Sequence, residues 1–199
     1  MRRFYRDWVN LPHLQRFEVK IKETDLLVMA DRPLEKETVD LVLHARQQIE
    51  AYIEQNPQFL TSLSPLPMDP FAPPLIRVML EAGLNFGVGP MASVAGAIAQ
   101  FVGEGLRLYS GEVIVENGGD VYASTKGPLK VGLLPWPDKK DLEIRIELRQ
   151  TLMPVSVCSS SSRIGHSLSF GSADLACIVS PSGAMADAAA TSAGNRLRK

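Results

Sequence analysis

Apolar and polar side chains alternate in the segment Phe17–Ala30, FEVKIKETDLLVMA, and the alternation restarts at Leu26. This pattern is typical of strands with one buried face, so it predicts two antiparallel strands joined by a turn at Glu23-Thr24-Asp25. From Leu34 to Gln55 the apolar positions recur at helical spacing behind an acidic first turn. The expected buried face of this helix comprises Val39, Leu43, Ala45, Ile49 and Ile53. The fold therefore begins with a hairpin and a helix packed on it.

The remaining elements are short and follow a proline-rich stretch at Pro57–Pro74, which predicts an irregular connection. Residues 1–199 therefore form one domain, or two small lobes that meet near 57–74. Helices are expected at 74–82, 89–106 and 184–196, and strands at 112–116, 131–134, 142–148 and 175–179. This order predicts an α+β fold with a mixed, largely antiparallel sheet and helices packed on its face.

Composition excludes several classes of function. The formal net charge of -1 provides no electrostatic footprint for nucleic acid or an anionic membrane. No segment has the apolar run of a signal peptide or membrane span, so we expect a cytoplasmic protein without a membrane partner. Cys158 and Cys177 have neither disulfide-framework nor zinc-site spacing. The oligomeric state stays open, a homo-oligomer included.

The sequence Asn117-Gly118-Gly119-Asp120 directly follows the strand expected at 112–116. Two adjacent glycines permit positive φ and leave backbone N–H groups to face an anion or a flat ring. An Asn-Gly pair is also the strongest short signal of an ordinary hairpin turn. The sequence alone leaves both interpretations open, a binding turn and a plain turn.

A serine-rich segment, CSSSSRIGHSLSFG, occupies Cys158–Gly171 between two expected strands. Its hydroxyl groups suit a phosphate or a polar ring edge, and Arg163 and His166 add a fixed and an adjustable positive charge. We expect Ser159–Ser169 to form an ordered loop at the site. The candidate binding hydroxyls are Ser159, Ser160 and Ser161. The alternatives are a solvated connection without a role, and a nucleophile pair of Cys158 with His166.

Asp187 and Thr191 lie four residues apart on the expected last helix, so their carboxylate and hydroxyl groups share one face. Two oxygen ligands in this arrangement suit a hard cation such as Mg²⁺. The small residues at Ala186–Ala190 would leave room for a ligand. Alternatively, Asp187 complements the dipole at the N-terminus of its own helix. A shared site requires Asp120 to lie beside Asp187.

Three segments occur in the same order as the signature segments of ApbE-like proteins: Gly96–Gln100 (GAIAQ), Val115–Asp120 (VENGGD) and Ala186–Thr191 (ADAAAT). On these residues the chain resembles the ApbE-like superfamily, which implies an ApbE-like fold. The stretch Gly165–Asp174, GHSLSFGSAD, resembles the loop of a small, largely uncharacterised branch of that superfamily.

In the flavin transferases of this superfamily, the small-residue helix and the GGD turn help to hold FAD, and a D-x-x-x-T pair binds Mg²⁺. The resemblance implies metal ligation by Asp187, Thr191 and the carbonyl of Ala97, and a flavin or nucleotide site lined by Gly118, Gly119 and Asp120. It also places His166 where the transferases carry a histidine. The chain departs from their pattern at Gln100, where they have lysine, and at Ser167–Ser169, which does not reproduce H-x-x-D-P.

Three hypotheses follow. The leading one is a protein that binds FAD or a related nucleotide and transfers or cleaves a phosphate-linked group with Mg²⁺, in which the serine loop with Arg163 stabilises the negative charge that develops. Its candidate catalytic residues are His166 and Arg163. The second is a non-catalytic accessory protein of sulfur assimilation into homocysteine, with Cys158 as its thiol, since members of the small branch are connected with that process. The third is a structural module without a ligand.

Overall fold

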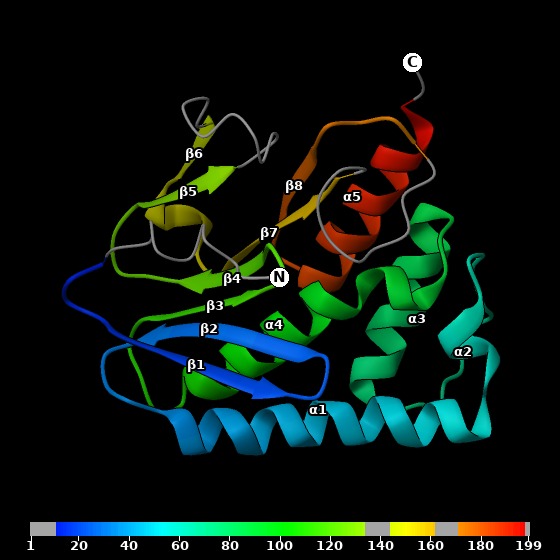
Figure 1. Ribbon diagram of the computed structural model, residues 1–199, viewed down its shortest axis with the longest axis horizontal. Helices are drawn as coiled ribbons and strands as arrows, with labels where there is room; N and C mark the ends of the chain where they lie inside the picture. Colours follow the sequence, from blue (N-terminus) through cyan, green and yellow to red (C-terminus); the bar gives the residue numbers. More distant parts are fainter. Residues whose placement is uncertain (1–10, 134–143, 162–170, 198–199) are drawn as a thin grey trace.

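The computed structural model describes residues 11–133, 144–161 and 171–197, and it has an α+β fold (Figure 1). Six strands form one sheet in the order β1-β2-β3-β4-β7-β8, and every neighbouring pair in it is antiparallel. These strands are β1 (Gln15–Ile21), β2 (Thr24–Ala30), β3 (Val113–Asn117), β4 (Asp120–Ser124), β7 (Val155–Ser160) and β8 (Ala176–Ser180). The sheet is thus antiparallel throughout instead of mixed.

A second, two-stranded sheet pairs β5 (Leu129–Leu133) with β6 (Ile144–Leu148). The helices are α1 (Glu35–Gln55), α2 (Gln58–Thr61), α3 (Pro74–Phe86), α4 (Val94–Leu106) and α5 (Gly183–Arg196), with short 3-10 turns at Pro90–Ser93 and Gln150–Leu152. Helix α3 continues past Gly83 to Phe86 and is capped by Gly87, which adopts the left-handed conformation with φ of 70°. Its end therefore lies later than the sequence predicts.

The hairpin and helix expected at the start of the chain are both present. The turn between β1 and β2 falls at Lys22-Glu23, and Lys22 has a φ of 52°. The buried face of α1 runs through Thr38, Val42, Ala45 and Ile49, whereas Leu43 is half exposed. The prediction that Leu43 belongs to the buried face is wrong, because the true stripe lies one residue earlier around the helix.

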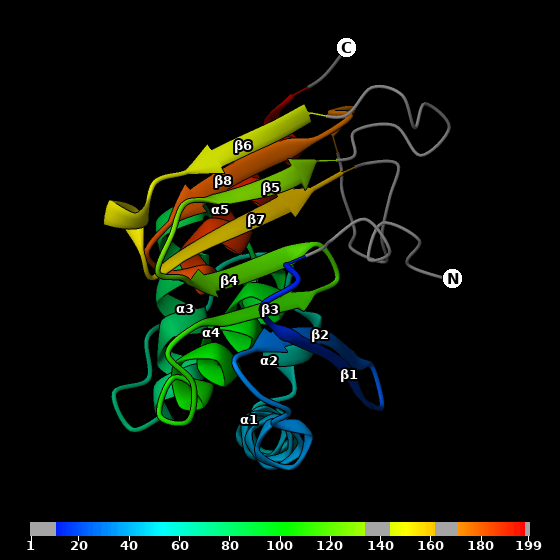
Figure 2. The same ribbon diagram turned by 90° about the vertical axis from the view of Figure 1, so that its left-hand side faces the viewer.

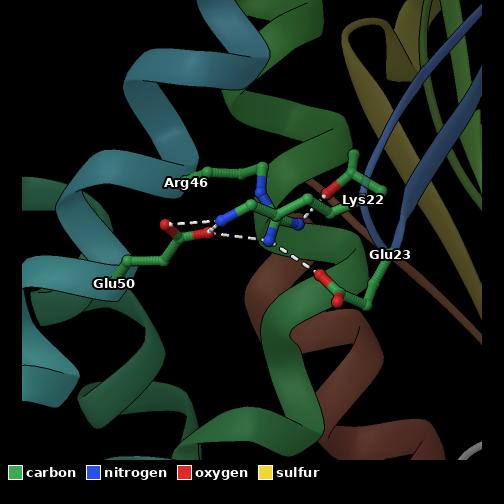
Figure 3. A network of polar contacts seen from close by, with 5 residues as sticks. Lys22, Glu23, Arg46 and Glu50 are labelled. Atoms are coloured by element: carbon green, nitrogen blue, oxygen red, sulfur yellow. Dashed lines mark hydrogen bonds and ion pairs between the residues drawn. The ribbon is translucent and has the colours of Figure 1, made fainter.

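Polar contacts fasten the β1–β2 turn to α1 (Figure 3). The guanidinium group of Arg46 donates to Glu23 Oε2 and Glu50 Oε1, both at 2.7 Å, and to Thr24 Oγ1 at 3.0 Å. Lys22 Nζ lies 3.1 Å from both carboxylate oxygens of Glu50. Arg46 therefore holds the hairpin turn at a fixed place along the helix.

Two apolar clusters lie on opposite faces of the large sheet. The main cluster packs helices α1, α3, α4 and α5 against one face, and Figure 2 shows the helices gathered on that side. A smaller cluster on the other face joins Met29, Ile114 and Val157 to Leu129 of β5 and Leu148 of β6. The central strands are therefore covered on both faces, so they are rich in buried residues.

Two strands are present that the sequence does not predict. β4 continues directly from the NGGD turn, and β7 includes Cys158, Ser159 and Ser160, which the sequence assigns to a loop. β7 lies between β4 and β8, so it connects β8 to the rest of the sheet. Within the described ranges, no single helix is both long and apolar enough to cross a membrane; α3 and residues 90–106 meet that test only together, with a 104° bend between them.

Candidate functional site

The NGGD turn is a two-residue hairpin turn between β3 and β4, in which Asn117 is paired with Asp120. Gly118 and Gly119 have φ of 67° and 106°, values that glycine adopts without steric cost. The N–H of Gly119 donates to Glu116 Oε1 at 2.7 Å. The expectation that this N–H is left for a ligand is therefore wrong, because a carboxylate of the chain itself already accepts it.

The turn is also tied to helix α4. Asn117 Nδ2 donates to the carbonyl oxygen of Ala95 at 3.1 Å, near the first residue of α4. Asp120, the first residue of β4, is buried, and its Oδ1 accepts the N–H of Ser159 at 3.0 Å. The side chain of Asp120 is thus held in place by the backbone of β7.

Asp187 lies in the second turn of α5 and accepts hydrogen bonds from the N-terminal part of α4. Its Oδ2 accepts the N–H of Gly96 at 2.9 Å, and the backbone of Ala95 also donates to it. The first N–H groups of a helix have no partner within the helix, so Asp187 supplies an acceptor that α4 lacks. Asp187 does not act as the first-turn acid of its own helix; it caps a neighbouring helix.

The carboxyl groups of Asp120 and Asp187 lie in contact, and each influences the pKa of the other. Burial, with a smaller contribution from the charge of Glu116, raises the pKa of Asp120 to about 7, although the hydrogen bond from the N–H of Ser159 opposes the shift. Burial, followed by the charge of Asp120, raises the pKa of Asp187 well above its ordinary value. Two carboxyl groups in contact cannot both ionise cheaply, so the pair shares one proton.

The other predicted metal ligands lie near this pair. Thr191 is buried one turn further along α5, on the same face as Asp187, and Ala97 is buried in α4, which packs on α5. The alanines of α5 between them are also buried, so they fill the helix interface instead of leaving room for a ligand. Among the described residues, no three His, Cys, Asp or Glu side chains gather closely enough to hold a metal. A cation here would need hydroxyl, carbonyl or water oxygens as well.

Cys158 lies on β7 beside Asp120, with its side chain fully buried. Its Sγ lies 3.5 Å from the carbonyl oxygen of Gly183. Burial and then the charge of Asp120 raise the pKa of this thiol well above its ordinary value, so it stays protonated. A buried protonated thiol is a poor nucleophile, and this disfavours a nucleophilic role for Cys158.

The serine-rich segment divides between described and undescribed residues. The backbone N–H of Ser159 binds Asp120, and its hydroxyl group is hydrogen-bonded to Cys177 of β8. Ser160 is buried, and the hydroxyl of Ser161 donates to the carbonyl oxygen of Asp174 at 2.7 Å. The hydroxyl groups of Ser159 and Ser161 therefore contact the protein itself.

Arg163 and His166, the predicted catalytic residues, lie outside the described residues, as does the segment 162–170 around them. The sequence also misses two residues that organise the site, Glu116 and Gln100. Glu116 had a signal: a charged residue after the apolar part of a strand, two positions before a double glycine, indicates a side chain that serves the turn. Gln100 had none beyond its departure from the family lysine.

Comparisons with known proteins bear on this arrangement. A family model described as AbpE bacteria matches residues 6–199. A UPF0280 protein of Methanococcus maripaludis strain C5 is 40% identical over 182 residues, covering 89% of this chain and 74% of that protein. A UPF0280 protein of Methanocaldococcus jannaschii is 40% identical over 181 residues, covering 89% and 73%.

A solved structure has a similar fold. The apo crystal structure of the Pseudomonas stutzeri flavinyl transferase ApbE superposes with a TM-score of 0.60 at 13% identity, covering 90% of this chain and 83% of that one. Sequence and fold therefore agree with the resemblance seen in the three motifs. The chain belongs to the UPF0280 family, described as AbpE bacteria, within the ApbE-like superfamily.

Proposed function

We propose that this protein binds a flavin or a related nucleotide together with Mg²⁺, beside the NGGD turn and helix α5, and assists the transfer or cleavage of a phosphate-linked group. The contact between the carboxyl groups of Asp120 and Asp187, which come from β4 and α5, carries the proposal. The ApbE-like fold supports the flavin part, because the structural neighbour is a flavinyl transferase.

The oxygen atoms near the pair suit a hard cation. The candidate ligands are the carboxylate of Asp187, the hydroxyl of Thr191 and the backbone carbonyl of Ala97. All three would bind the cation through oxygen atoms, the ligands that Mg²⁺ prefers. Two carboxyl groups that share a proton mark a place where negative potential is concentrated. When bound there, Mg²⁺ would neutralise charge on a pyrophosphate and favour its cleavage.

The residues of the chain would hold this site in a fixed geometry. The N–H of Ser159 orients Asp120, and the N–H of Gly96 orients Asp187, so neither carboxyl group has to reorganise when a ligand binds. A Cβ atom at Gly119 would meet no atom of the described residues within 4 Å, which supports the approach of a flat ring to the turn. Arg163 and His166 would stabilise negative charge on the transferred group.

The metal part is tested with Asp187→Asn, measured by calorimetric titration of the whole chain with Mg²⁺. Asparagine keeps the shape, can accept from Gly96 and can donate to Asp120, but it lacks the charge that a cation needs. We expect the affinity to fall by at least the roughly 10- to 100-fold that loss of an outer-shell partner costs. Asp40→Asn, an exposed change on α1, is the matched control. Equal affinity in Asp187→Asn and in the control would refute the metal site.

The flavin part is tested by titrating FAD into the protein with and without Mg²⁺ and following flavin fluorescence. We expect saturable quenching that is stronger with Mg²⁺ and weaker in the double variant Arg163→Ala/His166→Ala. Unchanged flavin fluorescence at all protein concentrations would refute flavin binding. Unchanged affinity in the double variant would leave the turn and the carboxyl pair as the whole site.

A further inference from the structure

Helices α4 and α5 cross at two glycines in direct backbone contact. A Cβ atom at Gly96 would overlap the carbonyl oxygen of Gly183, and a Cβ atom at Gly183 would overlap that of Gly96. No side chain separates the two helices at this crossing. Their relative position therefore depends on this backbone contact and on the polar groups that surround it.

Those groups form a reciprocal pair of hydrogen bonds. The N–H of Gly96 donates to Asp187 Oδ2 at 2.9 Å, and the N–H of Gly183 donates to Gln100 Oε1 at 2.6 Å. On each helix the acceptor side chain lies four residues after the glycine, hence one turn further on the same face. Each helix thus supplies the acceptor for an N-terminal N–H group of the other.

The side chain of Gln100 is held at both ends. Its Oε1 accepts from Gly183, and its Nε2 donates to Glu104 Oε1 at 2.7 Å, one turn further along α4. Lysine could donate to Glu104 but could not accept from Gly183, and glutamate could accept but could not donate. A glutamine amide satisfies both contacts at once.

We propose that Gln100 is a positioning residue of the site: it fixes the first turn of α5 against α4 and thereby directs Asp187 toward Asp120. Asp187 follows Gly183 by one helical turn, so a shift of the first turn of α5 carries the carboxyl group with it. The carbonyl oxygen of Gly183, next to the Sγ of Cys158, ties the same turn to β7. The role in cation binding rests on the proposed function, whereas the positioning of Asp187 does not.

The test compares the whole chain with three variants. Gln100→Leu keeps the approximate size and removes both hydrogen bonds. Gln100→Glu keeps the acceptor for Gly183 but places a second carboxylate beside Glu104. The exchange variant Gln100→Glu/Glu104→Gln restores both hydrogen bonds with the amide on the other residue. Gln55→Leu, an exposed change at the end of α1, is the control.

Two measurements are made on each variant. The first is Mn²⁺ affinity by electron paramagnetic resonance, with Mn²⁺ standing in for Mg²⁺. We expect Gln100→Leu to bind about 10-fold more weakly, as for loss of an outer-shell partner, and the exchange variant to recover most of the loss. The second is hydrogen exchange at the amides of Gly96 and Gly183. We expect Gln100→Leu to speed exchange at both amides. Gly183 loses its acceptor directly, and Gly96 loses protection because its acceptor, Asp187, moves with the first turn of α5.

The outcomes separate this inference from the proposed function. Wild-type protein that binds no Mn²⁺ overturns the metal site, and exchange at Gly96 then decides the role of Gln100 alone. Wild-type protein that binds Mn²⁺, with equal affinity in Gln100→Leu, overturns the positioning role in cation binding. Faster exchange at Gly183 with unchanged exchange at Gly96 means that Gln100 has only a local effect, and it overturns the positioning role altogether. If Gln100→Leu fails to fold, Gln100→Glu is compared with the exchange variant, because repulsion from Glu104 should displace residue 100 in the first and is absent from the second. Equal Mn²⁺ affinity and equal exchange at Gly96 in these two variants would overturn the positioning role.

Discussion

Replacing Gly96 with alanine tests the backbone contact between α4 and α5. In an open helix this change stabilises by about 1 kcal/mol, because alanine has the higher helix propensity. Here the new Cβ atom would lie 2.9 Å from the Cβ of Asp187 and 2.9 Å from the carbonyl carbon of Gly183, closer than real Cβ atoms approach. The Gly183 neighbour is a backbone atom, so it cannot move away by a rotamer change.

The helices must therefore separate. Overpacking of this kind costs about 1–3 kcal/mol, and separation would also weaken the hydrogen bond from Gly96 to Asp187, whose loss costs about 1–3 kcal/mol. Against the gain in propensity we expect a net loss of about 1–5 kcal/mol. For a chain of 199 residues, each kcal/mol lowers Tm by about 2–4 °C.

The assay is urea unfolding followed by circular dichroism, with Gly127→Ala as control. Gly127 lies between β4 and β5, where an added Cβ atom meets no atom of the described residues within 4 Å, so its variant should stay within about 0.5 kcal/mol of wild type. A Gly96→Ala protein as stable as wild type, or more stable, would refute the close crossing. The same result would remove the geometric basis for assigning a positioning role to Gln100.

Three further predictions concern charge and reactivity. Burial raises the pKa of Asp120 to about 7, so the folded state binds more protons than the unfolded state above pH about 4, and stability should fall as pH rises toward 7. Measured by urea unfolding from pH 5 to 7, above the range where a carboxylate with lowered pKa such as Glu50 titrates, this slope should become shallower in Asp120→Asn, which leaves only Asp187 of the pair, and an unchanged slope would contradict the raised pKa of Asp120. Arg46→Met removes the ion pairs drawn in Figure 3 and should lower the free energy of unfolding by about 1 kcal/mol or less, and by still less in 1 M salt, because the side chains of Glu23 and Glu50 are 84% and 43% exposed; a loss that salt does not reduce would mean that packing dominates. A thiol reagent should modify half-buried Cys177 before fully buried Cys158, with Cys158 reacting only on unfolding, as peptide mapping would show; prior reaction of Cys158 would contradict its burial.

The first half of the fold follows from local patterns in the sequence. The β1–β2 hairpin has regular alternation, and α1 has helical spacing behind an acidic first turn. Neither pattern depends on the rest of the molecule. The miss at Leu43 is a rotation of the buried stripe by about one residue, and the partners of the helix, which decide it, are distant in sequence.

The missed strand β7 has a different physical cause. Its inner positions are Ser156, Cys158 and Ser160, and serine runs are more common in loops than in buried strands. These small side chains suit the close packing of α5, which contacts β7 extensively. The alternate residues Val155 and Val157 face the second apolar cluster. β7 is thus a strand because of the helix that covers it, and this helix lies beyond it in the sequence.

The small residues of α5 have a similar explanation. As a sequence, the alanine-rich stretch suggests space for a ligand, whereas in the structure the alanines are buried and bring the helix close to α4 and β7. This short distance is what allows the carboxyl group of Asp187 to reach both the first turn of α4 and Asp120 on β4.

The shared site implied by the resemblance to ApbE-like proteins predicts that Asp120 and Asp187 meet, but it does not predict how they are held. Glu116 accepts an N–H of the turn, and the N–H of Ser159 donates to Asp120. Gln100 accepts an N–H at the start of α5. Each of these contacts depends on how two elements cross, which no local pattern encodes. A larger residue at Gly96 or Gly183 would leave every motif in the sequence intact and still move the carboxyl groups apart. We therefore expect the affinity of this site for a cation to depend on the helix crossing as strongly as on the acidic residues themselves.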